Sequence, residues 1–255
     1  MVLYLMEVQM KLETNHYVFH YLKDSVAEKE IDNISNLQEG CYIFISNCLG
    51  TEAKTKIHYH FFDTPEEVGK QYAIVHNDDD DEPCNGFALP DTMSFDGMNH
   101  IYAVYNDKVK CIGFHEDAHI ISYSYGRPKS KFIREGLAMY FDRYWWGIDN
   151  FSWSKFYLKQ GKMPSLSTLF QDSEFDKYSD VITYPLAGAF TSYLIERFGI
   201  DQYVKFYKAC DIGVISSFNN VFGDIDEIEN GFINYLDMIH LRDSIRNLII
   251  EDLSK

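Results

Sequence analysis

The hydrophobic pattern of this 255-residue chain changes near its middle, and this change limits the possible folds more than any other feature. The first half mixes strand-like alternation with helix-like spacing, whereas the second half is almost entirely helix-like. Strands are predicted at 16–21, 56–62, 86–88 and 101–105, and helices at 25–49, from Thr64, at 107–123, 130–146 and 183–199, from Asp201, and within 225–253. The pattern predicts an α+β fold with an N-terminal mixed β-sheet lobe and a mostly α-helical C-terminal lobe.

The chain is long enough to bury a core, and no linker-like segment divides it. We therefore predict a single domain over residues 1–255 with two lobes that share a cleft. The helix-breaking triplet Gly126-Arg127-Pro128 separates the approximate lobes 1–127 and 128–255.

The charge balance narrows the possible partners. The chain has 23 Lys and Arg against 39 Asp and Glu, a formal net charge of −16. Such a protein repels phosphate backbones and anionic bilayers, so we expect neither nucleic acid nor a membrane as a partner. The five cysteines are odd in number and form no CxxC pair, a pattern typical of reduced thiols rather than of disulfides or a thiolate zinc site.

Targeting and membrane signals are not evident in the pattern. The first ten residues lack a cationic start and are interrupted by Glu7, which predicts no signal peptide. No apolar run reaches the length of about 18 residues that a spanning helix needs. A cytoplasmic location is therefore expected, while the oligomeric state is not predicted.

Residues 115–119 read His-Glu-Asp-Ala-His and lie inside a predicted helix. Side chains four apart share one helix face, so His115 and His119 can offer two imidazoles to one metal ion. Glu116 is rotated about 100° from His115 and borders this face without having to bind the metal. The spacing matches HExxH, which supplies two zinc ligands and a general base from one helical turn.

A third ligand is predicted on the following helix. A catalytic zinc needs three protein ligands and one open position, and Glu135 lies sixteen residues after His119. Gly136, beside it, would let the two helices approach closely. The alternative, that Glu135 is a plain surface residue, is less favoured because the motif precedes it.

These segments resemble the gluzincin metallopeptidases, the HExxH peptidases whose third zinc ligand is a glutamate. The resemblance covers approximately residues 15–240 and rests on three segments: HEDAH at 115–119, FIREGLAMYF at 132–141 and YPLAGAFTSYLIERFG at 184–199. It implies a zincin-like fold in one catalytic domain, with Zn²⁺ as the cofactor, a peptide or protein as the substrate and Glu116 as the base. His115, His119 and Glu135 become the zinc ligands.

The resemblance also implies a residue that stabilises the oxyanion, and Tyr184, at the start of the matching helix, is the candidate. An equally good interpretation is that Tyr184 packs a helix N-terminus, as one of 19 tyrosines. One departure is Met139, which stands where some family members carry a carboxylate that supports the first histidine; Asp117 and Asp142 could replace it. No acidic motif for a free substrate amine is found, which argues against an aminopeptidase.

Two other readings of the motif remain open. The chain could be a catalytically silent, peptidase-like module that binds a protein or peptide, although such a module would not need Glu116. Alternatively, the zinc could be structural and closed by Cys111, which would lie one turn before His115 on the same helix.

Other metal-binding patterns are weaker. His58 and His60 share one strand face, but no third ligand is evident, so a partly exposed strand face is the favoured reading. The acidic run at 78–83 lacks the spacing of a calcium loop, and we interpret it as a solvated loop. Five further histidines are interpreted as isolated surface or core residues: His16, His20, His76, His100 and His240.

Overall fold

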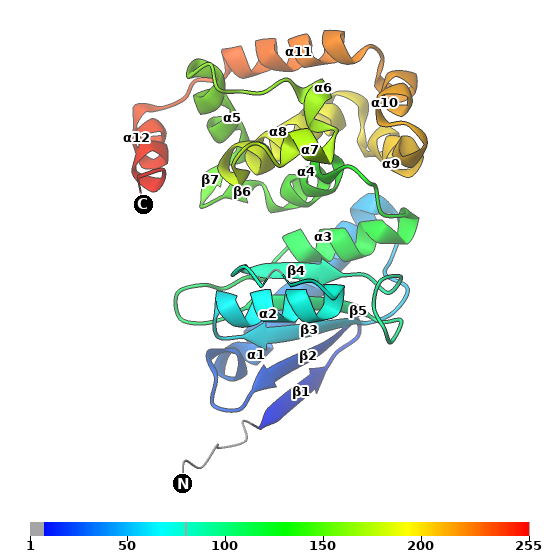
Figure 1. The fold of residues 1–255 in the computed structure, drawn as a ribbon, viewed down its shortest axis with the longest axis vertical. Helices are drawn as coiled ribbons and strands as arrows, with labels where there is room; N and C mark the ends of the chain where they lie inside the picture. Colours follow the sequence, from blue (N-terminus) through cyan, green and yellow to red (C-terminus); the bar gives the residue numbers. More distant parts are fainter. Residues whose placement is uncertain (1–7, 80, 255) are drawn as a thin grey trace. The chain divides into compact units, whose positions relative to one another are not determined.

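The structure is a computed structural model that describes residues 8–79 and 81–254. The chain divides into two compact units, Met1–Ser124 and Tyr125–Lys255 (Figure 1). The first seven residues, which carry part of the argument against a signal peptide, and Asp80 of the acidic run lie outside the described residues.

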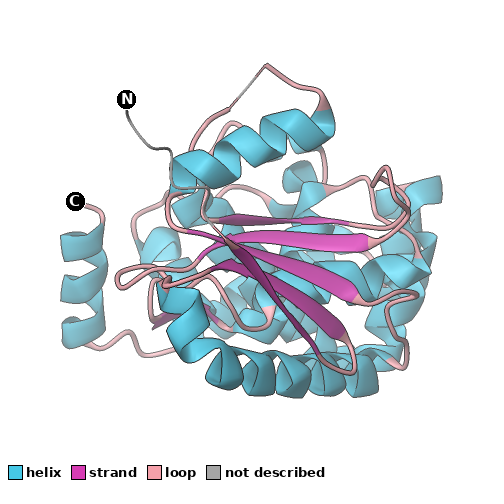
Figure 2. Ribbon diagram, turned by 90° about the horizontal axis from the view of Figure 1, so that it is seen from below, coloured by secondary structure: helices cyan, strands magenta, loops and turns pink. Residues whose placement is uncertain are grey.

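The first unit is built on a five-stranded mixed sheet with the strand order β1-β2-β3-β5-β4. Its elements are β1 (Gln9–Glu13), β2 (Tyr17–Leu22), α1 (Val26–Leu49), β3 (Ile57–Phe62), α2 (Pro65–His76), β4 (Gly86–Leu89), β5 (Asn99–Val104) and α3 (His115–Ser122). Strands β2, β3 and β5 are parallel, and the edge strands β1 and β4 run antiparallel to their neighbours. Figure 2 shows the strands as one twisted sheet.

Local signals define the helices that cross over between the parallel strands. The side chain of Ser25 accepts from the backbone N–H of Glu28 at the start of α1, and Gly50 ends this helix in the left-handed conformation. Thr64 and Glu67 form a capping box at the start of α2. These helices confirm the predicted ones at 25–49 and from Thr64.

The two faces of the sheet are covered differently. On one face Tyr17 of β2 contacts both α1 and α3, because its hydroxyl donates to Gln38 and to Asp117. On the other face, Val68 of α2 packs with Tyr102 and other apolar side chains of β4 and β5. By the strand register, Tyr17 and Tyr102 lie on opposite faces of the sheet, so α1 and α3 contact one face and α2 contacts the other.

The predicted helix 107–123 is much shorter in the structure, because α3 begins only at His115. Asn106 organises a turn instead: its side chain accepts from the backbone N–H groups of Lys108 and Val109. Tyr105 then pairs with Lys110 in a β-bridge. These contacts carry the chain through an extended segment where a helix was predicted. Strand β1 is a further difference, because the sequence pattern predicted no strand before residue 16.

The second unit is largely helical, and α8 packs against α4, α5 and α9. Its elements are α4 (Lys131–Asp142), β6 (Tyr144–Trp145), β7 (Ile148–Asp149), α5 (Asn150–Lys159), α6 (Leu166–Leu169), α7 (Asp172–Phe175), α8 (Asp180–Phe198), α9 (Ile200–Ala209), α10 (Val214–Phe222), α11 (Ile225–Met238) and α12 (Asp243–Asp252). No helix among the described residues has the length and apolar character to span a membrane. The two units confirm the α+β fold predicted from the pattern.

Several helix ends in this unit differ from their predicted positions. Helix α4 stops at Asp142 rather than near 146, because Arg143 adopts the left-handed conformation. Helix α8 begins at Asp180, so Pro185 lies within it and not at its entry. The helical pattern over 225–253 is interrupted between Met238 and Asp243.

Two glycines bring α4 and α8 into close contact. A Cβ atom on Gly136 of α4 would lie 2.5 Å from Thr191 Oγ1 and 3.1 Å from the carbonyl oxygen of Ala187, both on α8. A Cβ atom on Gly188 of α8 would lie 2.6 Å from the Cβ atom of Met139 on α4. Gly136 was expected to admit the HEDAH helix, but its close contacts are with α8.

Candidate metal centre

Helix α3 carries the two histidines of the HEDAH segment one turn apart. The ring centroids of His115 and His119 lie 5.1 Å apart, and their planes are nearly perpendicular at 83°. His119 is buried and His115 is partly exposed. The spacing expected from helical geometry is therefore present: His115 begins this eight-residue helix, and His119 lies in its last turn.

Tyr123 supports the second histidine. Its hydroxyl lies 3.3 Å from Nδ1 of His119, and the two rings stack with centroids 5.6 Å apart. In the tautomer that carries its proton on Nδ1, His119 donates to the Tyr123 oxygen and keeps the lone pair of Nε2 for a metal. A hydrogen bond of this kind orients a histidine ligand and fixes its tautomer.

Asp117 anchors α3 to the sheet and to α1. Its carboxylate is fully buried and accepts hydrogen bonds from the hydroxyl of Tyr17 and, at 3.0 Å, from Nε2 of Gln38. The side-chain amide of Gln38 also donates to the carbonyl of Gly113 and accepts from its N–H, just before α3 begins. Burial raises the pKa of Asp117 well above its usual range, while the two donors oppose that rise. These bonds give Asp117 an anchoring role in α3.

We expect a Tyr17→Phe variant to lower the free energy of unfolding by about 1–2 kcal/mol, because the buried carboxyl of Asp117 loses a donor. Tyr59→Phe is the matched control. Tyr59 is equally buried, and its hydroxyl donates to a neutral acceptor, the carbonyl of Cys111, at 2.9 Å. Urea unfolding of the zinc-free chain measures both changes. A loss in Tyr17→Phe no larger than in Tyr59→Phe would contradict the anchoring role.

Glu116 lies beside the edge strand β4. A Cβ atom on Gly86 would stand 3.5 Å from Glu116 Oε1 and 2.9 Å from Sγ of Cys111. Because Gly86 has no side chain, the backbone of β4 lies next to the carboxylate of Glu116. Burial, and secondarily the charge of Glu116, raise the pKa of the Cys84 thiol.

The structure removes the basis for a zinc ligand at Cys111. This residue precedes α3 and is not part of the helix, so it does not lie one helical turn before His115. Its backbone pairs with β5 instead, since its N–H donates to the carbonyl of Val104 at 2.9 Å. The geometric argument for a site closed by Cys111 was therefore wrong.

In the helical unit, Glu135 lies in the middle of α4 and is partly exposed. The buried guanidinium of Arg134 donates to the carbonyls of Pro128 and Lys129, which fixes the segment that leads into this helix. A further carboxyl in this unit is that of Asp180. Burial raises the pKa of Asp180, the charge of Lys131 lowers it, and the charge of Glu135 raises it further. Asp180 was not singled out in the sequence.

The structure places Tyr184 in an aromatic cluster of the helical unit. Its ring centroid lies 5.1 Å from that of Trp145 and 5.9 Å from that of Phe175. These contacts give Tyr184 a packing role on α8, as in the second sequence interpretation. Its role toward an oxyanion stays a prediction.

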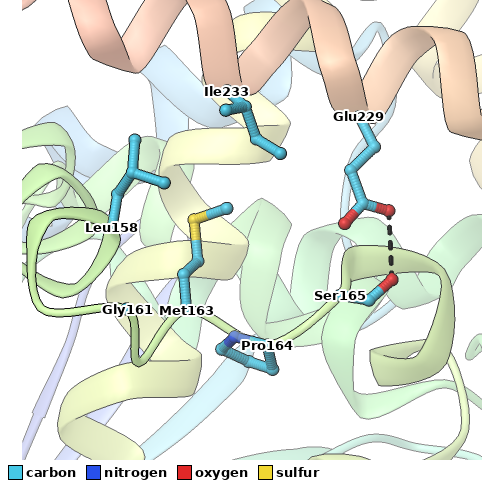
Figure 3. Close-up of a pocket in the computed structure, with 7 residues that line it drawn as sticks. All are labelled: Leu158, Gly161, Met163, Pro164, Ser165, Glu229 and Ile233. Carbon is cyan, nitrogen blue, oxygen red and sulfur yellow. Dashed lines mark hydrogen bonds between the residues drawn. The ribbon is translucent and has the colours of Figure 1, made fainter.

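A hollow in the helical unit lies between α5, α6 and α11 and is drawn in Figure 3. It is lined by Leu158, Gly161, Met163, Pro164, Ser165, Glu229 and Ile233. The carboxylate of Glu229 accepts from the backbone N–H of Leu166 at 2.9 Å and from the hydroxyl of Ser165 at 3.2 Å. Glu229 is the one ionisable residue in the lining of this hollow, and its carboxylate caps α6. The lining therefore offers no group of catalytic residues.

His115, His119 and Glu135 form a group that could hold a metal ion. Two imidazole nitrogens and one carboxylate oxygen are a donor set that suits Zn²⁺ and leaves a fourth position for water or substrate. The predicted ligands therefore have the donor atoms that Zn²⁺ prefers. Tyr123 supplies the hydrogen bond to a histidine ligand for which the sequence indicated no partner.

No family model matches this chain, and no curated protein sequence does.

Proposed function

We propose that this protein is a zinc-dependent metallopeptidase that hydrolyses peptide bonds with Glu116 as its general base. The observation that carries the proposal is the candidate metal-binding group His115, His119 and Glu135, with Glu116 beside the first histidine. A metal bound only for stability would not require a carboxylate at this position. The resemblance of three ordered segments to the gluzincins supports the same reaction.

His115, His119 and Glu135 would hold the Zn²⁺ ion, which would polarise the scissile carbonyl and lower the pKa of the attacking water. Glu116 accepts the proton of the attacking water and delivers it to the nitrogen of the leaving amine. His119 is held in one orientation by Tyr123, so its ligating nitrogen need not reorganise during the reaction. Tyr184 is proposed as the donor to the oxyanion.

Strand β4 offers a binding edge for the substrate. It is the last strand of the sheet, and its Gly86 brings backbone close to Glu116. An extended peptide can pair with such an edge through main-chain hydrogen bonds, which do not depend on its sequence. We propose that the substrate backbone lies along β4, and that this places a peptide bond near the base.

The test is the zinc content of the purified full-length chain and of a His119→Ala variant, measured by elemental analysis. We expect the variant to hold one equivalent of zinc fewer than the wild type, because an alanine removes one of three ligands. His240→Ala, which removes an exposed histidine between α11 and α12, is the control and should keep the wild-type content.

Equal zinc in the wild type and in His119→Ala, after incubation with Zn²⁺ at neutral pH, would contradict the metal centre. A catalytically silent module for binding proteins or peptides would then be the better proposal. Such a module predicts peptide binding without turnover.

A further inference from the structure

Four histidines line one face of the sheet in the first unit, away from α3. The register pairs His20 of β2 with His60 of β3, and His58 of β3 with His100 of β5. Alternation along each strand puts these side chains on the face opposite to Tyr17 and Tyr59. His20 and His100 were predicted to be isolated, and the sheet corrects this by bringing distant segments into register.

The imidazoles contact one another closely. Nε2 of His20 lies 3.1 Å from Nδ1 of His58, and the rings of His20 and His60 stack with centroids 4.4 Å apart. Ligand atoms of His20, His58 and His60 all lie within 4.8 Å of one another. The three side chains are partly exposed, so an ion can reach them from solvent.

The carboxylate of Asp96 determines, through His100, which ring nitrogen of His60 carries the proton. Asp96 lies 3.0 Å from Nε2 of His100, and Nδ1 of His100 lies 3.1 Å from Nε2 of His60. A carboxylate only accepts, so neutral His100 donates from Nε2 and accepts at Nδ1. His60 then donates from Nε2 and keeps a lone pair on Nδ1. The relay Asp96–His100–His60 thus leaves one nitrogen of His60 available as a ligand.

We propose that His20, His58 and His60 form a second metal site, which binds Zn²⁺ or a similar divalent transition-metal ion. His100 and Asp96 act as positioning residues that orient His60. On binding, the proton shared between His20 and His58 moves to another ring nitrogen, so both facing nitrogens present lone pairs. The site lies within the first unit and does not depend on the proposed peptidase function.

The geometry suits a transition metal. Two nitrogens bound to a tetrahedral zinc at about 2.05 Å lie about 3.3 Å apart, close to the 3.1 Å between the facing nitrogens of His20 and His58. Imidazole ligands favour zinc, copper and nickel over calcium or magnesium. The formal net charge of −16 attracts cations in general. A histidine ligand bonded to a carboxylate relay is the arrangement that tunes metal affinity.

The competing interpretation is a stack of neutral histidines that only packs the sheet. His60 also stacks on Tyr102, with centroids 4.7 Å apart, and burial lowers the pKa of His60 to about 3 and that of His20 to about 4. Neutral rings serve packing and metal binding equally well. The two interpretations differ in whether zinc binds.

The test uses the full-length chain with His115→Ala and His119→Ala, which silence the α3 site, and titrates it with ZnCl₂ by isothermal calorimetry. We expect one bound Zn²⁺ per chain. Adding His58→Asn should weaken binding at least tenfold, whereas Asp96→Asn should weaken it about 10–100-fold without abolishing it. Adding His240→Asn, the matched control, should change nothing. No zinc binding by the silenced chain, or binding that His58→Asn leaves unchanged, would overturn the proposal.

A second measurement needs no substitution in the sheet, so it holds even where His58→Asn fails to fold. The silenced chain is treated with diethyl pyrocarbonate with and without ZnCl₂, and labelled histidines are located by peptide mass spectrometry. Zinc should protect His20, His58 and His60 while His240 stays reactive. Equal labelling of the three with and without zinc would refute the site.

Discussion

A Glu116→Gln variant is expected to keep its zinc and to lose turnover by about 10²–10⁴-fold. The amide is nearly isosteric with the carboxylate, so the ligands on α3 and α4 are retained. It cannot accept the proton of the attacking water, however, and no proton reaches the leaving amine. The rate is measured on a quenched fluorescent peptide library, and zinc by elemental analysis of the same samples.

Glu66→Gln is the matched control for this variant. Glu66 is an exposed carboxylate in the first turn of α2, so its loss should leave the rate unchanged. An unchanged rate in Glu116→Gln would exclude Glu116 as the base. Tyr184→Phe in the same assay separates the two roles of Tyr184: an oxyanion donor predicts a lower kcat with normal zinc, and a packing residue predicts a normal kcat.

Gly188→Ala is expected to destabilise the chain by about 3 kcal/mol, the upper end for overpacking a core. The added methyl group would lie 2.4 Å from Nδ2 of Asn150 and 2.6 Å from the Cβ atom of Met139. Asn150 cannot turn away freely, because its amide donates to the carbonyl of Met139 at 2.9 Å. Helix α4 therefore has to move away from α8, and Glu135 moves with it.

Gly40→Ala is the control of opposite sign. Gly40 lies on the exposed face of α1, and nothing lies within 4 Å of the position that a methyl group would take there, so alanine should stabilise the helix by about 1 kcal/mol. Urea unfolding of both variants measures the difference. A Gly188→Ala variant as stable as the wild type would show that α4 and α8 are not as closely packed as the structure has them.

Elements with local signals could be predicted from the sequence. Helix α1 follows its pattern from the cap Ser25 to Gly50, and the capping box at Thr64 identifies α2, because these hydrogen bonds join residues within one turn. The pair His115 and His119 is local in the same sense. Tyr123, four residues after His119, could have been found by the same spacing rule.

Features that depend on pairing between distant segments were not predictable. The predicted start of α3 is too early because Asp107 is a good cap in isolation, whereas the bridge between Tyr105 and Lys110 competes for the same segment. The histidine face needed the register of three strands, since His20, His58 and His100 come from separate parts of the chain. Hydrophobic periodicity alone carries no information about that register.

The hydrogen bond between Tyr17 and Asp117 joins residues 100 positions apart, and this has a consequence for the order of events during synthesis. At about 5–20 residues per second, β2 and α1 leave the ribosome several seconds before α3 does. The residues that hold Asp117 are thus available when the two histidines appear, and Glu135 is made last. Under the proposed function, a metal ion can therefore bind to all three ligands only after the residues that support them have been synthesised.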